Sequence, residues 1–294
     1  MNLKDLLVAK EIDPQRVLVL RHRPLEPELS KVLPWLAAER PEVFNAYQQT
    51  QTKQVEAEMA RATHVVAFIG HEPGKALFVG LYSMNGSKPI TPKQYWQIPA
   101  NVELKTFGVQ GFTKESPRSS MLWFDLVLTD FYAEWKGKLI VRWPPLDKNW
   151  HRWAHKPRNN MPVVAILDES QLDAAMPDWD AIELTWEQLS VLPTRWRLRL
   201  QEWRAIYYVF DTSVNKGYVG SAYGKENLLQ RWEKGYGASG HCGNRLLTGR
   251  DPKNFRFTIL QRVSPDMDVD DVIRIENSWK NRLHTRHPHG LNDN

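Results

Sequence analysis

The sequence has little cysteine and no long apolar run. Cys242 is the one cysteine among 294 residues, which excludes an internal disulfide framework and a zinc site built from several cysteines. No run approaches the roughly 18 apolar residues that a membrane span needs. Lys10, Glu11 and Asp13 interrupt the apolar N-terminal stretch, so a secretory signal is not expected either. These absences predict a cytoplasmic protein with no membrane partner.

The sequence also lacks the common motifs that cradle phosphates. Neither GxxxxGK[ST] nor GxGxxG occurs, so nothing indicates nucleotide hydrolysis or dinucleotide binding. His151 and His155 have the spacing of two metal ligands on a helix, but no third ligand is obvious and the local charge is positive. We expect no metal at that pair. His284, His287 and His289 lie in residues 284–294, which we expect to form an irregular, flexible basic tail.

The length of 294 residues favours two domains, because a typical domain has about 100 to 200 residues. Runs rich in β-branched and aromatic residues predict strands at 63–70, 75–84, 121–131 and 138–143. We therefore expect a β-rich N-terminal domain over residues 1–175, with a small barrel as one option. Good helix formers predict one long surface helix over 41–62, and residues 176–203 are predicted to be a helical linker interrupted near Pro193.

The net charge of +5 is only weak support for an anionic partner, since many proteins are as basic. Its distribution is more informative, because residues 136–158 mix cations with tryptophans and contain one acid, Asp147. Cations beside aromatic rings suit contacts to phosphates and bases. The alternative of a solvated loop whose tryptophans pack on the core stays open. The residues expected to bind DNA are Arg142, Trp143, Lys148, Trp150, Arg152, Trp153, Lys156 and Arg158.

The C-terminal part, residues 204–294, begins with a predicted β-hairpin. AIYYVF (205–210) and GYVGSA (217–222) are short strand-like runs separated by a polar turn. Side chains alternate between the faces of a strand, so Tyr207 and Tyr218 can share one face while Tyr208 packs on the other. The following pattern predicts a helix with Arg231 at 225–236, a strand at 254–263, and an amphipathic helix with Glu276 at 269–283. The fold class is therefore α/β in the α+β sense, with a small antiparallel sheet flanked by helices here.

This order of elements resembles the GIY-YIG nuclease family, from Arg204 to Asn292. AIY stands in the place of GIY and YVG in the place of YIG. The resemblance implies that Tyr207, Tyr218, Arg231 and Asn292 are catalytic. It also implies that Glu276 binds Mg²⁺ or Mn²⁺.

Two departures from the family pattern affect the site. Ala205 replaces the first glycine, and a strand tolerates the added methyl unless backbone approaches there. A histidine that many members carry one turn after the arginine is replaced by Gly235. Tyr236 or His241 would take the place of that histidine, and the sequence leaves both open.

The expected chemistry is hydrolysis of a phosphodiester bond in double-stranded DNA. It needs a base for the attacking water, a charge clamp for the phosphate, and help for the leaving oxygen. Tyr207 is the candidate base, although ordinary phenols are poor bases and need a nearby cation. Without the family context, strand tyrosines pack in a sheet, and Arg231 and Glu276 are ordinary surface charges.

These observations predict a restriction or host-defence endonuclease, either dependent on or indifferent to modified bases, with its target recognised by the N-terminal domain. A homodimer on the DNA fits this reading. A repair or structure-specific nuclease, and a DNA-binding protein with an inactive nuclease fold, are the alternatives.

Overall fold

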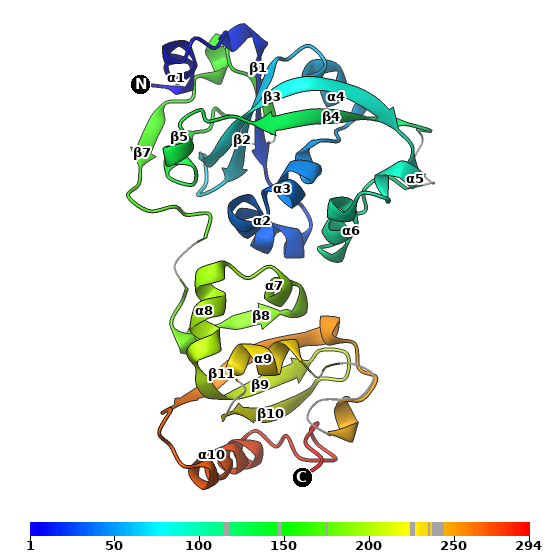
Figure 1. Ribbon diagram of the computed structural model, residues 1–294, viewed down its shortest axis with the longest axis vertical. Helices are drawn as coiled ribbons and strands as arrows, with labels where there is room; N and C mark the ends of the chain where they lie inside the picture. Colours follow the sequence, from blue (N-terminus) through cyan, green and yellow to red (C-terminus); the bar gives the residue numbers. More distant parts are fainter. Residues whose placement is uncertain (114–117, 146–148, 174–175, 224–226, 235, 237–243) are drawn as a thin grey trace. The chain divides into compact units, whose positions relative to one another are not determined.

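The computed structural model describes residues 1–113, 118–145, 149–173, 176–223, 227–234, 236 and 244–294. The chain divides into two compact units, Met1–Ala174 and Ala175–Asn294. Each unit combines helices with a β-sheet (Figure 1), which confirms the predicted α+β class. Among the described residues, no helix has both the length and the apolar character needed to cross a membrane.

The first unit is built on a seven-stranded mixed sheet with the order β6-β1-β2-β3-β5-β7, and β4 also pairs with β3. Only β1 and β2 run parallel; the other pairs are antiparallel. Within the described residues, no pairing of the end strands closes the sheet into the barrel that was one option. The strands are β1 (Val17–His22), β2 (His64–Gly70), β3 (Lys75–Ile90), β4 (Met121–Leu128), β5 (Leu139–Arg142), β6 (His151–Trp153) and β7 (Val163–Ile166).

Helices cover both faces of this sheet at β1, so β1 is buried along its whole length. Val17 and Val19 point towards α1, and His22 points the other way, to Phe44 of α3. Figure 1 shows α2, α3 and α6 gathered on one side of the ribbon formed by β3 and β4. The helices are α1 (Leu3–Ala9), α2 (Pro27–Glu39), α3 (Pro41–Gln48), α4 (Lys53–Met59), α5 (Pro92–Tyr95) and α6 (Pro99–Thr106).

The single long surface helix predicted over 41–62 is wrong. The chain forms α3 and α4 instead, with a break before Thr52, whose backbone is extended at φ −65° and ψ 154°. Two threonines in the break have low helix propensity, which lets the chain turn there. Phe44 and Met59 are completely buried, so both helices belong to the core.

The second unit holds a four-stranded antiparallel sheet with the order β10-β9-β11-β8. The predicted hairpin, third strand and final helix correspond to β9, β10, β11 and α10. The break near Pro193 also lies where it was expected, between α7 and α8. The elements are β8 (Glu183–Thr185), α7 (Trp186–Ser190), α8 (Thr194–Glu202), β9 (Arg204–Asp211), β10 (Lys216–Ala222), α9 (Leu228–Glu233), β11 (Phe255–Val263) and α10 (Val269–Arg282).

Residues 176–203, expected to be a linker, contribute to this second unit. β8 adds a fourth strand to the sheet, pairing Leu184 with Phe257 and Thr185 with Arg256. The short strand ELT carries too little pattern to be recognised in isolation. Its pairing makes this stretch part of the same compact body as the hairpin.

The end of the chain is not a free tail. After α10, the Leu291 amide donates to the Gly217 carbonyl of β10 at 2.9 Å, and Thr285, Leu291 and Asn292 are buried. Gly290 is required for this path, because a Cβ there would lie 2.2 Å from the Thr285 carbonyl oxygen. The C-terminal segment therefore covers the open edge of β10, which would otherwise expose unpaired backbone groups.

Candidate active site

A cavity of about 240 Å³ in the second unit gathers most of the residues that the family resemblance singles out. β10 is an edge strand of the sheet, and the cavity opens beside it. The lining comes from the hairpin, α9, α10 and the C-terminal segment. It consists of Tyr207, Tyr218, Ser221, Tyr223, Arg231, Asn244, Glu276, Lys280, Asn292, Asp293 and Asn294.

Strand pairing puts the two predicted tyrosines on the same face. Tyr207 is opposite Gly220, and Tyr218 is opposite Val209, so the tyrosines form a diagonal pair with ring centroids 6.3 Å apart. Gly220 leaves space for both rings, because a Cβ there would lie 2.5 Å from the Tyr207 hydroxyl oxygen. Tyr208 lies on the opposite face, in the cluster beneath α10. The predicted orientation of the three tyrosines is therefore confirmed.

Arg231 reaches the cavity from α9. The helix begins where the side chain of Asn227 accepts a hydrogen bond from the Gln230 amide at 2.9 Å. Trp232 anchors it to the sheet, with its ring 6.4 Å from Tyr207 and 5.6 Å from Phe257. This anchor directs the preceding residue, Arg231, to the cavity.

Glu276 approaches the cavity from α10, and both of its carboxylate oxygens are engaged. Oε1 pairs with the ammonium of Lys280 at 2.7 Å, one turn along the helix. Oε2 accepts a hydrogen bond from the Ser221 hydroxyl of β10. Lys280 is buried and also donates to Asn294 Oδ1 at 2.8 Å. A network of charge and oxygen donors thus links α10, β10 and the end of the chain.

The donor set fits one hard cation. Mg²⁺ keeps several of its waters and binds through one or two carboxylates together with a substrate phosphate. Glu276 and Asp293 supply carboxylates to the lining, and Ser221 and Asn294 add neutral oxygens. In the described part of the chain no cluster of three or more His, Cys, Asp or Glu residues is arranged for a metal. The site would therefore hold a cation through few protein ligands. The Lys280 ammonium already contacts Glu276, so a bound cation would share that carboxylate with Lys280.

Asn292 is brought to the cavity, but both polar atoms of its side chain bind backbone. Oδ1 accepts from the Val219 amide at 3.0 Å and Nδ2 donates to the Val219 carbonyl at 2.8 Å. The side chain is 1% exposed. This geometry makes Asn292 a positioning residue that fixes the edge of β10, instead of a group that touches substrate.

Tyr236 and His241 are the two residues expected to take the place of the missing histidine, and the structure describes one of them. Tyr236 is buried with its ring edge-on to Phe255 at 5.3 Å and to Phe257 at 5.6 Å, and it is absent from the cavity lining. Its place in this aromatic cluster is a packing position. His241 lies outside the described residues.

Two residues of the expected DNA-binding stretch belong to the interior of the first unit. Trp143 is 3% exposed and packs in the core with Phe68, so it is not available to stack on a base. Arg152 is buried as well, donating to Asn159 Oδ1 at 2.9 Å and to the Pro145 carbonyl at 2.7 Å. The DNA contacts predicted for Trp143 and Arg152 are wrong, because both side chains maintain the fold.

The other residues of that stretch are distributed over the surface. Arg142 ends β5 and is exposed, and Lys148 lies outside the described residues. Trp153, Lys156 and Arg158 line a concavity of about 890 Å³ with the edge of Arg152, and Trp150 lines a different cavity. His151, on β6 and not on a helix, has Nε2 3.5 Å from Glu58 Oε1.

Several lining residues were not predicted. Lys280 follows Glu276 by one helical turn, a spacing that itself favours an ion pair. Ser221 lies directly after the second tyrosine motif, on the strand that the motif identifies. Asn244, Asp293 and Asn294 carry no local signal, because loops bring them to the cavity. Comparison of this chain with protein-family models, with curated proteins and with solved structures finds no match.

Proposed function

We propose that this protein is a Mg²⁺-dependent DNA endonuclease that hydrolyses phosphodiester bonds. The observation that carries the proposal is the meeting of Tyr207, Tyr218, Arg231 and Glu276 in one cavity. These side chains come from the β9–β10 hairpin, from α9 and from α10, which are separate segments of the sequence. The order of the motifs predicted these four residues together, and their meeting in one cavity supports a shared role in catalysis.

The chain's own residues divide the work as follows. As a phenolate, which the nearby cations Arg231 and Lys280 favour, Tyr207 takes the proton of the attacking water, and the leaving oxygen takes a proton from solvent water. Tyr218 holds the water or the phosphate in line. Arg231 offers planar, permanently charged donors to the phosphate oxygens as charge develops on them.

Glu276 would hold the metal, with oxygens of Ser221, Asp293 and Asn294 around it. Bound Mg²⁺ supplies charge neutralisation and lowers the proton affinity of water. Lys280 orients the Glu276 carboxylate through their 2.7 Å contact. Since one cavity provides one set of these groups, breaking both strands requires two copies on the DNA or two successive cuts, which keeps the homodimer in the proposal.

The second part of the proposal concerns the location, the substrate and the cellular role of the enzyme. We place the enzyme in the cytoplasm, acting on double-stranded DNA in restriction or host defence, with the first unit selecting the target. The exposed cations Lys156 and Arg158 beside Trp153 support a contact to the phosphate backbone. A repair or structure-specific nuclease would use the same cavity on branched DNA.

The test is a nicking assay on the full chain. Supercoiled plasmid, plain, methylated or hydroxymethylated, is incubated with Mg²⁺, Mn²⁺ or a chelator. We expect nicked or linear product that needs the metal and disappears in Glu276→Gln. Glu233→Gln is the matched control, since its carboxylate pairs with Arg197 at the surface and is expected to keep full activity.

Two results separate the alternatives. Cleavage confined to branched or flapped DNA favours the repair reading. Binding of DNA without cleavage of any substrate overturns the nuclease in favour of an inactive DNA-binding protein. Because Glu276→Gln also removes the partner of buried Lys280, circular dichroism must show that this variant is folded.

A further inference from the structure

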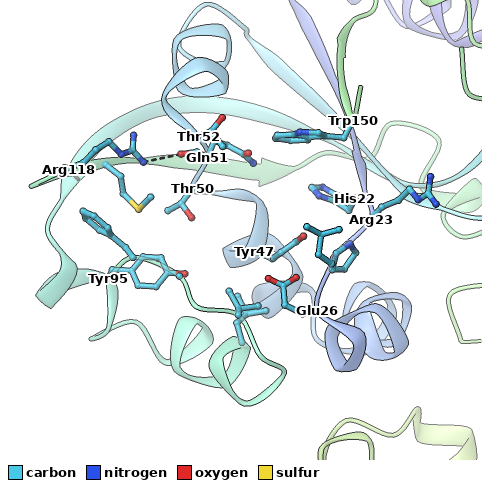
Figure 2. Close-up of a pocket in the computed structure, with 17 residues that line it drawn as sticks. His22, Arg23, Glu26, Tyr47, Thr50, Gln51, Thr52, Tyr95, Arg118 and Trp150 are labelled. Carbon is cyan, nitrogen blue, oxygen red and sulfur yellow. Dashed lines mark hydrogen bonds between the residues drawn. The ribbon is translucent and has the colours of Figure 1, made fainter. Parts of the chain in front are cut away.

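The first unit contains a cavity of about 880 Å³ that the proposed chemistry does not use (Figure 2). It lies between the end of β1, the loop before α2, the segment after α3, and residues 95–112 and 118–121. Aromatic and apolar side chains form much of its wall, with a few polar groups among them. This is the usual composition of a site for a small organic group. Its labelled lining residues are His22, Arg23, Glu26, Tyr47, Thr50, Gln51, Thr52, Tyr95, Arg118 and Trp150.

A buried histidine presents a hydrogen-bond acceptor at this cavity. His22 is 5% exposed, and its Nε2 lies 3.2 Å from Gln48 Oε1. Gln48 Nε2 donates to Asn45 Oδ1 at 3.1 Å, and Asn45 Nδ2 donates to the Leu126 carbonyl at 2.8 Å. This relay fixes Gln48 Oε1 as an acceptor, so the proton of the ring is on Nε2 and Nδ1 is left to accept. Burial lowers the pKa of His22 from 6.5 to about 4, against a smaller opposing effect of Gln48, so the ring is neutral.

A carboxylate and two phenols stand on the neighbouring wall. Burial, and the charge of Glu26, raise the pKa of Tyr47 well above its usual range. Burial raises the pKa of Tyr95 to about 12, against a smaller effect of Thr50. Both phenols therefore remain protonated. Among the described residues, the Glu26 carboxylate takes part in no hydrogen bond or ion pair. Glu26 and His22 Nδ1 thus give the cavity two acceptors that suit a ligand with N–H groups.

Two further side chains suit a flat ligand that arrives from a nucleic acid. Trp150 is half-buried, and its carbonyl accepts from the Arg21 amide at 2.7 Å, which holds the indole beside His22 (Figure 2). An indole at the mouth of a cavity is a stacking surface for a base. Leu25 is 95% exposed on the lip, between Pro24 and Glu26. DNA-binding proteins insert apolar side chains such as leucine between base steps of a duplex and partly unstack them.

We propose that this cavity receives a single nucleobase turned out of DNA, stacked by Trp150 and read through its amino group by Glu26 and His22. Leu25 takes the place of that base in the duplex. A carboxylate acceptor matches the amino group of cytosine or adenine, and thymine has no such group. The proposal rests on the proposed function, because it gives the first unit its way of selecting a target for the cavity that cuts.

The test measures DNA affinity of the full chain carrying Glu276→Gln, by fluorescence polarisation. The probes are duplexes of one sequence in which cytosine, adenine or thymine is either paired or placed opposite an abasic site. An unpaired base has already lost its partner, which removes part of the cost of a few kcal/mol for extrusion. We expect unpaired cytosine or adenine to bind at least about tenfold more tightly than the paired duplex, and unpaired thymine to gain less.

Matched variants assign the effect to this cavity. Trp150→Ala should lose about 5-fold to 100-fold in affinity for the unpaired base, the range of one base–aromatic stack. Trp153→Ala, in the neighbouring concavity, should lose little of that preference. Glu26→Gln should reduce the difference between cytosine and thymine. Leu25→Ala should weaken binding of the paired duplex, and Leu198→Ala, an equally apolar exposed residue of the second unit, should not.

The outcomes are separable from those of the nicking assay. Equal affinity for paired and unpaired bases, or equal losses in Trp150→Ala and Trp153→Ala, overturns the base pocket and leaves the nuclease untouched. Binding of free deoxycytidine monophosphate without any preference for unpaired bases overturns the delivery of the base from DNA. The expected preferences in a chain that cuts no DNA would retain the pocket and remove the nuclease.

Discussion

The side chain of Asn292 completes the open edge of β10 through Val219, accepting from its amide at 3.0 Å and donating to its carbonyl at 2.8 Å. One amide group thereby satisfies both polar groups of one backbone residue. The same strand carries Tyr218 and Ser221, on either side of Val219, into the cavity. The position of the final residues is therefore coupled to the position of the proposed catalytic groups.

Asn292→Ala should destabilise the second unit by about 2 kcal/mol, because two buried backbone groups lose their partner. The measurement is hydrogen exchange of the Val219 amide in the full chain, which should become faster in the variant. Asn281→Ala is the control, since Asn281 is exposed and its side chain accepts a hydrogen bond from Arg286 Nε at 3.1 Å. Unchanged protection of Val219 would mean that the edge does not depend on Asn292.

Gly220→Ala should strongly reduce both stability and nicking activity, although it adds a single methyl group. The new Cβ would lie 2.5 Å from the Tyr207 hydroxyl oxygen and 2.8 Å from Tyr218 Cε1, so both rings must shift. Overpacking of this kind costs about 1–3 kcal/mol, and we expect nicking to fall below detection. Ala205→Gly removes one methyl from the same hairpin and should cost about 1 kcal/mol with activity retained. Activity in Gly220→Ala close to that of the parent chain would refute the tyrosine pair.

Tyr207→Phe should reduce the single-turnover cleavage rate by at least about 100-fold, the scale of losing a positioned acid–base group. Tyr208→Phe should have a small effect, because its ring packs beneath α10 beside Val219. The comparison is sharp because the two residues are adjacent and lose the same atom. A larger loss in Tyr208→Phe than in Tyr207→Phe would place the chemistry on the other face of the sheet.

Much of the second unit could be predicted because its signals are local. Alternation within the hairpin orients Tyr207, Tyr208 and Tyr218, and the 3.6-residue period of α10 puts Glu276 on the same face as the buried Val272 and Lys280. β8 was missed because three residues have no readable period and are stabilised by pairing with β11. The C-terminal segment was misjudged because its order comes from backbone hydrogen bonds to β10, which composition does not encode.

The first unit was less predictable for a related reason. Trp143 lies in a basic stretch, yet packing against Phe68 and the guanidinium of Arg21, 4.6 Å from its ring, takes it into the core. Composition describes which groups are near in sequence, and the sheet decides which of them face solvent. The proposed base pocket is the clearest case, since His22 and Trp150 are brought together by the pairing of β1 with β6 and by the hydrogen bond from the Arg21 amide to the Trp150 carbonyl.

His22 should make stability depend on pH. Burial lowers its pKa to about 4 in the folded chain, below the ordinary value of 6.5. The unfolded chain therefore binds the proton more readily between these values, and stability falls as the pH drops through that window. Between about pH 7.5 and pH 5 this group alone should remove about 2 kcal/mol.

The measurement is urea unfolding of the first unit in the full chain at about pH 7.5 and pH 5. His22→Gln retains a side chain that can contact Gln48 and has no proton to bind, so its loss of stability on acidification should be smaller. His289→Gln, at an exposed position after α10, controls for removing a histidine. Equal pH dependence in the parent chain and in His22→Gln would show that His22 does not titrate in this way.

Lys280 allows the metal site to be tested without measuring cleavage. Its ammonium is buried and lies 2.7 Å from Glu276 Oε1. Lys280→Met leaves the Glu276 carboxylate without its charge partner, which should cost about 3 kcal/mol or more in metal-free buffer. Mg²⁺ bound to that carboxylate would replace the missing charge, so it should raise the melting temperature of Lys280→Met more than that of the parent chain.

The double variant Lys280→Met, Glu276→Gln should be more stable than Lys280→Met in metal-free buffer and should not respond to Mg²⁺. Equal responses to Mg²⁺ in the parent chain and both variants would remove Glu276 from the metal site.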